Sequence, residues 1–210
     1  MATGIFITFE GGEGAGKSTQ IRRLAQRLNT MGRDVVLTRE PGGSEGAEAI
    51  RDLLLNGAAE KWSATTETLL MYAARRDHLE RVVRPALAEG KIVLCDRFAD
   101  STRAYQGAGG DADPGLIEAM ERYVVGSDWP SVTLILDLPV DKGLTRAASR
   151  GGGEARFESK GQAFHERLRA AFLAIAEREP QRCVVVVADQ SIDAVEADIW
   201  AAVEPRLKAG

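Results

Sequence analysis

Gly11-Gly12-Glu13-Gly14-Ala15-Gly16-Lys17-Ser18 is the stretch of this 210-residue chain that decides its fold. One glycine followed, after four residues, by Gly-Lys-Ser is typical of a loop that cradles a polyphosphate. Glycines reach positive φ without steric cost, so successive backbone amides can point inward at a β-phosphate. Lys17 is expected to reach the β- and γ-phosphate oxygens, and Ser18 Oγ to ligate Mg²⁺. The residues expected to bind a nucleoside triphosphate are Gly11, Gly12, Glu13, Gly14, Ala15, Gly16, Lys17, Ser18 and Thr19.

The flanking sequence supports this interpretation, because the mechanism needs the loop to join a buried strand to a helix. Residues 5–9 form an apolar, β-branched run of strand length. Residues 18–31 repeat apolar side chains at helical spacing and stop before Gly32. Such a helix directs its free N-terminal amides at the phosphates. A flexible glycine linker, the alternative, would not lie between a strand and an amphipathic helix.

Four further apolar runs of strand length follow, each separated from the next by helical periodicity; they are residues 35–38, 92–95, 132–136 and 184–187. Nearly continuous apolar strands indicate burial on both faces, and therefore a parallel sheet between helices. We expect an α/β fold of the P-loop type: a three-layer sandwich with a five-stranded parallel sheet flanked by helices and a short lid loop. Residues 1–210 should form a single P-loop domain, with the lid at about 147–159.

Two predicted helices contain residues that indicate where a helix begins or is interrupted. Asp113 and Pro114 supply an N-cap and a first-turn proline for a helix over residues 115–125. A longer helix over residues 66–89 carries Pro85 near its end, where a kink or break is expected.

Composition excludes several classes of function. With a net charge of −4, the chain has no excess positive field to hold a nucleic acid or an anionic membrane. Its apolar runs are too short to span a bilayer and its first residues do not resemble a signal peptide, so a cytoplasmic location is expected. Cys95 and Cys183 adjoin apolar runs and should be buried thiols. His78 and His165 lack metal-ligand spacing and are expected on the surface.

Residues outside the glycine-rich loop indicate which class of phosphate-transferring protein this is. A GTPase needs an Asn-Lys-x-Asp segment, but the only asparagines are Asn29 and Asn56, neither of which precedes a lysine. A kinase with a phosphorylated acceptor needs arginines at strand ends and in a closing loop, because two polyphosphate anions must meet. Arg39 and Arg97 follow predicted strands, and Arg150 and Arg156 flank a glycine-rich stretch. These arginines favour a kinase.

The motifs resemble those of the thymidylate kinase family over nearly the whole chain. Besides the P-loop, they are Thr38-Arg39-Glu40-Pro41-Gly42-Gly43, Tyr72-Ala73-Ala74-Arg75, Asp96-Arg97-Phe98, Ala104-Tyr105-Gln106-Gly107, Arg156-Phe157-Glu158 and Phe164-His165-Glu166-Arg167. The Arg-Glu-Pro-Gly-Gly and Ala-Tyr-Gln-Gly segments are specific to this family among nucleotide kinases. The resemblance implies transfer of the γ-phosphoryl of ATP to dTMP, with Mg²⁺, in a homodimer.

The resemblance also implies individual roles. Arg97 would contact the acceptor phosphate, and Asp96 would lie near Mg²⁺ together with Ser18. Tyr105 would crowd the sugar 2′ position, and Glu13 would lie near the 3′-hydroxyl. Where relatives stack a phenylalanine on thymine this chain has Met71, unless Tyr72 occupies that place. The acceptor set is Glu13, Arg39, Pro41, Met71, Arg75, Arg97, Ser101, Thr102, Tyr105 and Gln106.

The lid supplies the remaining catalytic charge. Some members of the family carry an arginine inside the P-loop, whereas this chain has Gly14-Ala15-Gly16 there. Arg150 and Arg156 are therefore the expected cis arginine fingers, acting with Lys17 and Arg97. Two alternatives remain: a kinase of another monophosphate, such as dUMP or a guanylate, and a catalytically idle P-loop nucleotide sensor.

Overall fold

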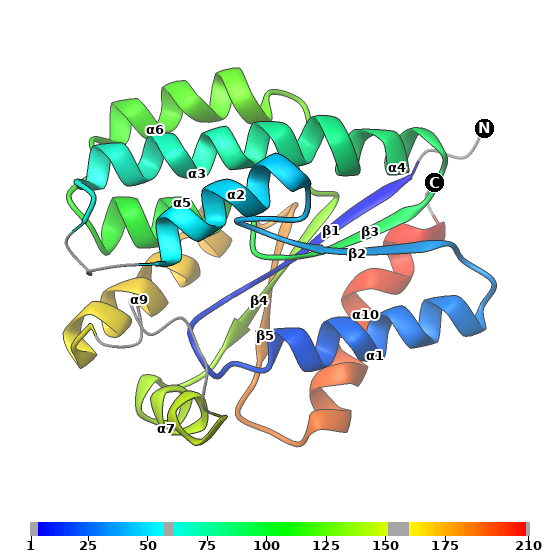
Figure 1. The fold of residues 1–210 in the computed structure, drawn as a ribbon. Coiled ribbons are helices and arrows are strands. Elements are labelled where there is room, and N and C mark those ends of the chain that lie inside the picture. Colours follow the sequence, from blue (N-terminus) through cyan, green and yellow to red (C-terminus); the bar gives the residue numbers. More distant parts are fainter. Residues whose placement is uncertain (1–3, 57–60, 151–159, 209–210) are drawn as a thin grey trace.

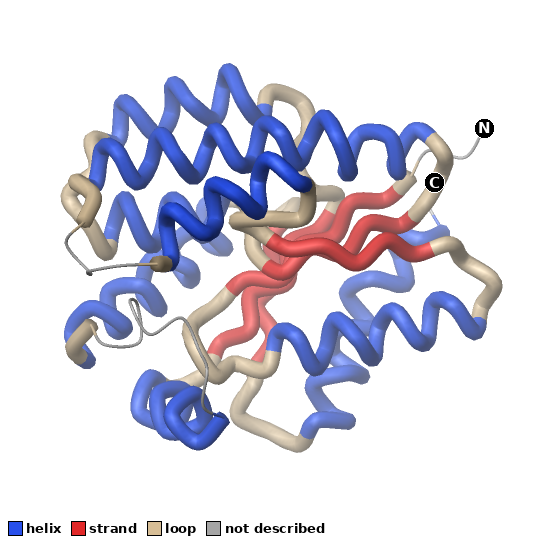
Figure 2. The backbone as a smooth tube through the Cα atoms, viewed as in Figure 1, coloured by secondary structure: helices blue, strands red, loops and turns tan. Residues whose placement is uncertain are grey.

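The computed structural model describes residues 4–56, 61–150 and 160–208 (Figure 1). A parallel sheet of five strands, in the order β2-β3-β1-β4-β5, runs through the middle of the molecule. Figure 2 shows helices packed on both faces of this sheet, which confirms the predicted sandwich. The strands are β1 (Ile5–Glu10), β2 (Val35–Arg39), β3 (Ile92–Asp96), β4 (Val132–Asp137) and β5 (Cys183–Val187).

The helices occupy the segments between the strands, as predicted. They are α1 (Lys17–Thr30), α2 (Glu45–Leu55), α3 (Ala64–His78), α4 (Arg84–Ala88), α5 (Ala99–Thr102), α6 (Pro114–Met120), α7 (Val140–Arg150), α9 (Gln162–Arg178) and α10 (Ile192–Lys208). Three π-helical segments continue α3, α5 and α6; they are η1 (Leu79–Val83), η2 (Arg103–Ala108) and η3 (Glu121–Val125). None of these described helices is long and apolar enough to cross a membrane.

The two faces of the sheet have separate cores, because successive side chains of a strand point to opposite faces. Ile7 and Phe9 of β1 pack in the cluster that includes residues of α1 and α10. Phe6, between them, packs with Tyr72 and Phe98 in the cluster on the other face. Because all strands are parallel, their carboxyl ends meet at one edge, where the P-loop follows β1 and Arg97 follows β3.

The predicted N-cap of α6 is confirmed. The carboxylate of Asp113 accepts a hydrogen bond from the amide of Gly115 and caps α6. Of the kink or break predicted at Pro85, the break does not occur, because the chain remains helical from α3 through η1 into α4. The wider π-helical turn lies directly before α4. It accommodates a ring that removes one amide donor and crowds the preceding turn.

The predicted burial is confirmed for the two cysteines and wrong for the two histidines. Cys95 and Cys183 are buried free thiols, as expected. The surface position expected for the histidines is wrong: His78 is 0% exposed and His165 is 4% exposed. Each lies on the inward face of its helix. His165 packs edge-on against Phe164, with 5.3 Å between ring centroids.

Candidate functional site

The glycine-rich loop lies between the carboxyl end of β1 and the start of α1, as its motif requires. Gly11, Gly14 and Gly16 have φ of 125°, 69° and 94°, which side-chain-bearing residues rarely adopt. A Cβ on Gly14 would overlap the carbonyl oxygen of Gly143 at the start of α7. Glycine is therefore needed here both for backbone conformation and for close packing of the loop. The amide of Thr19 donates to the carbonyl of Gly16 and begins the helix.

Lys17 is folded back on its own loop. It is 8% exposed, and its Nζ donates to the carbonyl oxygens of Gly11 at 3.0 Å and Gly12 at 2.9 Å. Burial lowers the pKa of Lys17, and the positive charge of Arg97 lowers it further. A phosphate anion entering the loop would replace the two carbonyls with a stronger, charged acceptor.

Ser18 and Asp96 lie together at the mouth of the loop. Ser18 Oγ donates to Asp96 Oδ2 at 2.9 Å, although the two residues are distant in sequence. A hydroxyl and a carboxylate oxygen are hard donors, and a Mg²⁺ held between nucleotide phosphates needs only one or two protein ligands. Among the described residues there is no cluster of three or more acidic, histidine or cysteine side chains for a metal. The pair nevertheless fits a phosphate-bound Mg²⁺.

Arg97 connects the P-loop to a second cleft. Its Nη2 donates to Glu13 Oε1 at 2.7 Å and its Nη1 to the carbonyl of Gly11 at 3.2 Å. Tyr105 completes the group, because its hydroxyl donates to Glu13 Oε1 at 2.8 Å and its ring lies 4.8 Å from the guanidinium carbon. Burial acts to raise the pKa of Glu13, but Arg97 and Lys17 together lower it to about 2. This carboxylate is therefore ionised throughout the physiological range.

The second cleft lies beside Arg97, between the end of β2, α3 and the segment that leads into η2. Most of the predicted acceptor residues line it. The lining residues are Glu40, Pro41, Leu55, Met71, Arg75, Arg97, Phe98, Ser101, Thr102, Tyr105 and Gln106. The structure thus brings together residues that four separate segments of the sequence contribute, from the end of β2 to η2.

Arg75 lines this cleft and carries one buried donor that has no partner among the described residues. Its Nε donates to Glu40 Oε2 at 2.7 Å and its Nη2 to Thr102 Oγ1 at 3.0 Å. Its Nη1, although buried, has no hydrogen-bond partner among the residues that the structure describes. Buried donors in proteins usually have an acceptor, so this one distinguishes Arg75 from the other arginines of the site.

Glu40 and His78 fix the orientation of Arg75, and neither was predicted as a site residue. His78 Nδ1 lies 2.9 Å from Glu40 Oε1, and His78 Nε2 lies 2.7 Å from Thr38 Oγ1. Burial acts to raise the pKa of Glu40, but Arg75 and His78 lower it. Glu40 belongs to the quoted Arg-Glu-Pro-Gly-Gly segment, and His78 follows Arg75 by three residues on one helix face. Those two signals could have placed both residues at the site.

Arg39, Met71 and Tyr72 differ in where their side chains lie relative to the cleft. Arg39 ends β2, but its side chain is 55% exposed, pairs with Glu48 at 3.0 Å and does not line the cleft. Met71 lines the cleft, whereas Tyr72 is 1% exposed and packs in the core on the α3 face of the sheet. Of these two residues only Met71 lines the cleft, and its contact with a base stays a prediction.

Most of the predicted lid lies outside the residues that the structure describes. Arg150 ends α7, and Arg156 lies outside the described residues, as does Glu158. The assignment of the lid arginines therefore stays a prediction.

A P-loop on a parallel sheet, next to an arginine-lined cleft for a second nucleotide, defines a P-loop nucleotide kinase. The sequence model of the family described as Thymidylate kinase matches residues 9–199. The chain belongs to the thymidylate kinase family.

Relatives and solved structures agree with this assignment. The chain is 69% identical to the thymidylate kinase of Caulobacter vibrioides over 207 residues, covering 99% of both proteins. It is 57% identical to that of Nitrobacter winogradskyi over 97% of this chain and 89% of the relative. The crystal structure of thymidylate kinase from Ehrlichia chaffeensis matches 96% of this chain and 99% of its own, with a TM-score of 0.79 and 33% identity.

Proposed function

We propose that this protein transfers the γ-phosphoryl group of ATP to dTMP, giving dTDP and ADP for dTTP synthesis. The observation that carries the proposal is the position of Arg97, which donates to a P-loop carbonyl and also lines the acceptor cleft. One guanidinium can therefore contact both phosphate groups. Membership of the thymidylate kinase family supports dTMP as the acceptor.

The chemistry needs positioning and charge neutralisation more than proton transfer. The acceptor oxygen belongs to a phosphate monoester, which is largely dianionic at pH 7 because its second pKa is about 6. No general base is required. Lys17 and Arg97 offset the negative charge of the two phosphates as they approach in line. For Arg97 this means exchanging its contact with Glu13 for a phosphate oxygen, or sharing it.

Mg²⁺ belongs to this proposal as a resident ion of the nucleotide complex. Ser18 and Asp96 would hold it, since their oxygens already lie 2.9 Å apart at the mouth of the loop. When bound, the ion supplies positive charge to the donor phosphates.

The lid would complete the site. We assign Arg150 and Arg156 as cis arginine fingers because the P-loop carries no arginine and both residues flank the glycine-rich stretch after α7. A finger that acts alone is typically worth on the order of 10³ to 10⁵ in rate. The lid, at about 147–159, would then be part of a single kinase unit formed by residues 1–210.

Base selection would come from the end of the cleft that Arg75 occupies. Its unpartnered Nη1 suits a thymine carbonyl, and Thr102 and Gln106 lie beside it for the N3 edge. The Tyr105 hydroxyl on Glu13 closes the sugar end, which favours a deoxyribose. A dUMP kinase remains the second candidate, because uracil presents the same carbonyls and only the thymine methyl contact with Met71 separates the two bases.

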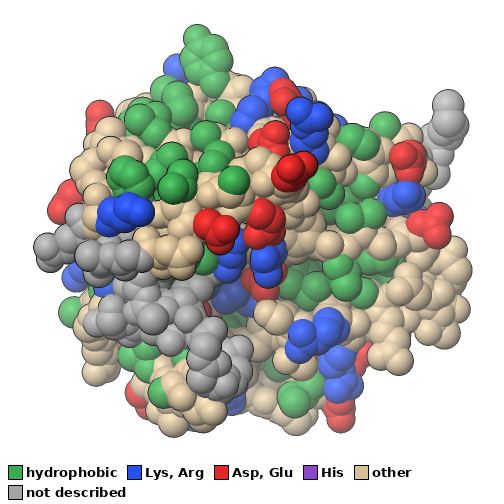
Figure 3. All heavy atoms as spheres, viewed as in Figure 1, with side chains coloured by type: hydrophobic (Ala, Val, Ile, Leu, Met, Phe, Trp, Pro, Cys, Tyr) green, Lys and Arg blue, Asp and Glu red, His purple; other side chains and the backbone are tan. Residues whose placement is uncertain are grey.

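We also propose a cytoplasmic homodimer. Leu69 on α3 and Tyr123 on η3 are exposed by 45% and 75%. Figure 3 shows hydrophobic side chains gathered over the face that α3 and α6 form. An exposed apolar face of this kind suits contact with a second copy. Sedimentation equilibrium of the wild-type protein and a Tyr123→Glu variant would test it, with dissociation expected in the variant.

An ADP-release assay tests the activity. With ATP and Mg²⁺, dTMP should support rapid turnover, dUMP slower turnover and dGMP almost none. Arg156→Ala should lower kcat, and Arg146→Ala, a neighbouring arginine of α7, serves as the matched control. Equal rates with all three acceptors would contradict the assignment of the base pocket. ATP binding without ADP release would favour a nucleotide sensor.

A further inference from the structure

Arg97 holds an unusual backbone conformation. Its φ of 72° makes it the one non-glycine residue with positive φ in the part of the chain that the structure describes. Such a conformation is costly for a residue with a side chain and persists only where the surroundings impose it. Something adjacent to Arg97 must therefore hold the loop between β3 and α5.

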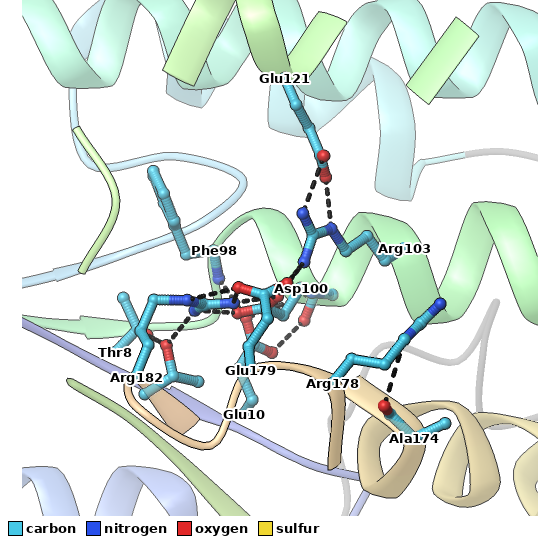
Figure 4. A network of polar contacts seen from close by, with 12 residues as sticks. Thr8, Glu10, Phe98, Asp100, Arg103, Glu121, Ala174, Arg178, Glu179 and Arg182 are labelled. Carbon is cyan, nitrogen blue, oxygen red and sulfur yellow. Dashed lines mark hydrogen bonds and ion pairs between the residues drawn. The ribbon is translucent and has the colours of Figure 1, made fainter. Parts of the chain in front are cut away.

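Glu10 makes the contacts that can do this. It is the last residue of β1, it is 0% exposed, and it points at the loop after β3 (Figure 4). Its Oε1 accepts hydrogen bonds from the amides of Phe98 at 2.7 Å and Ser101 at 3.2 Å. Its Oε2 accepts from Ser101 Oγ at 2.5 Å. The three donors belong to Phe98, which directly follows Arg97, and to Ser101 in α5.

Ser101 extends the clamp to the guanidinium itself. Because its hydroxyl hydrogen is donated to Glu10, its oxygen can accept from Arg97 Nη1, which lies 3.3 Å away. The backbone amide of Arg97 is held at the same time by the carbonyl of Phe9 at 2.9 Å. The end of β1 thus fixes Arg97 at its backbone, and through Ser101 at its side chain.

A second buried carboxylate braces the loop from the other side. Asp100 is 0% exposed and accepts hydrogen bonds from Arg182 at 2.7 and 3.0 Å. Figure 4 shows Arg182 beside Asp100. Arg182 also donates to Thr133 Oγ1 on β4, so α5 is tied to the sheet face. Burial first and Asp100 second raise the pKa of Glu10 to about 7. Keeping a carboxyl group at position 10 therefore opposes folding, where an apolar residue would pack without that penalty.

We propose that Glu10 is a positioning residue for phosphoryl transfer, which clamps the loop after β3 so that Arg97 points at the junction of the P-loop and the acceptor cleft. The inference rests on the proposed kinase activity. Glu10 itself touches no substrate in this scheme, because it lies behind Phe98 and Ser101. Its effect on the reaction passes through Arg97.

The test compares Glu10→Leu and Glu10→Gln in two backgrounds, wild type and Arg97→Ala. Leucine removes all three hydrogen bonds, so kcat should fall about 10²-fold, as expected for a misplaced catalytic group. Glutamine keeps an acceptor for both amides and should recover most of that loss. In the Arg97→Ala background neither change should alter kcat by more than about twofold, because the group they position is gone.

Three controls keep the outcomes distinct. Thr133→Val disturbs the same network away from Arg97, and should lower the melting temperature without lowering kcat. ADP affinity, measured by calorimetry, should be unchanged in the Glu10 variants because the P-loop is intact. If Glu10→Leu does not fold, Ser101→Ala replaces it, with a smaller loss expected only when Arg97 is present.

An unchanged kcat in Glu10→Leu, or an equal loss in both backgrounds, would overturn the inference. If the substitute variant Ser101→Ala gave either of those results, the conclusion would be the same. A wild-type protein that makes no dTDP would instead overturn the proposed function.

Discussion

The two ends of the acceptor cleft are built differently. At the base end, Arg75 and Glu40 form an ion pair with side chains 2% and 4% exposed, and His78 supports it from behind. At the phosphate end, Arg97 and Glu13 are each 12% exposed, and Lys17 is bound to carbonyls of its own loop. The base end is thus assembled before substrate arrives. At the phosphate end, Arg97 and Lys17 already have protein partners, which substrate phosphates would have to replace.

This difference separates binding from catalysis. A fixed set of donors loses little entropy on binding and selects the base, whereas groups that change partners on arrival can interact more strongly with the transferring phosphoryl. Changes at the base end should therefore alter KM and stability. Changes at the phosphate end should alter kcat.

The largest effect is expected at the phosphate end. Arg97→Ala should lower kcat about 10³-fold, a magnitude typical of losing a charged contact to the transferring group. The melting temperature should fall less than for a substitution at the base end, because Lys17 and the Tyr105 hydroxyl still stabilise the ionised carboxylate of Glu13. Steady-state kinetics and thermal unfolding measure the two quantities. Turnover near the wild-type rate at saturating substrates would remove Arg97 from the mechanism.

The base end should respond in the opposite way. Arg75→Met leaves Glu40 buried without its main counter-charge, which should cost about 3 kcal/mol of unfolding free energy. The KM for dTMP should rise, since the unpartnered Nη1 is lost with the rest of the guanidinium. Urea unfolding and kinetics with varied dTMP test both. Arg76→Met, one residue along and exposed, is the matched control and should change neither.

The ionisation of Glu13 predicts how stability depends on pH at the phosphate end. The folded pKa of about 2 lies below the ordinary value of 4.5, so the ionised form stabilises the fold above pH 4.5. That contribution, about 3 kcal/mol, should be lost as pH falls from 4.5 toward 2. Urea unfolding at pH 6 and pH 3 should show a smaller loss in Glu13→Gln than in the wild type. Parallel losses would mean that Arg97 does not stabilise this carboxylate.

The smallest effects are expected at Met71 and Tyr72, two adjacent residues of α3: one substitution should change the KM for dTMP and the other the stability. Met71→Phe places an aromatic ring in the cleft and should lower the KM for dTMP, by about 1 kcal/mol of binding free energy, without changing stability. Tyr72→Phe removes a buried hydroxyl that has no partner among the described residues, and should stabilise the fold by about 1 kcal/mol. A change in KM for Tyr72→Phe would reverse the assignment of the two positions.

Local patterns were sufficient to predict the fold and the P-loop. The five strands are apolar runs whose lengths the sequence displays directly, and the glycine spacing of the loop is a local motif. The partners of Arg75 were not predictable in the same way. Glu40 precedes it by 35 residues, and only the parallel sheet brings the end of β2 against α3.

Burial was the harder property to predict from sequence. His78 and His165 lie in polar helical surroundings, and helical periodicity does not reveal which face another element will cover. Arg39 shows the converse: a position at a strand end was predicted correctly, but the direction of its side chain depends on Glu48 of α2. At Pro85 the helix continues without a break because a wider turn directly precedes it.

The central position of β1 has a consequence for how the molecule opens. This strand has partners on both sides, whereas β2 and β5 are the edges and are only partly buried. Amide hydrogens of Ile7 and Phe9 should therefore exchange with solvent deuterium only when the entire molecule unfolds, while those of the two edge strands exchange through smaller fluctuations. The nucleotide loop thus follows the strand whose amides are expected to be the most protected.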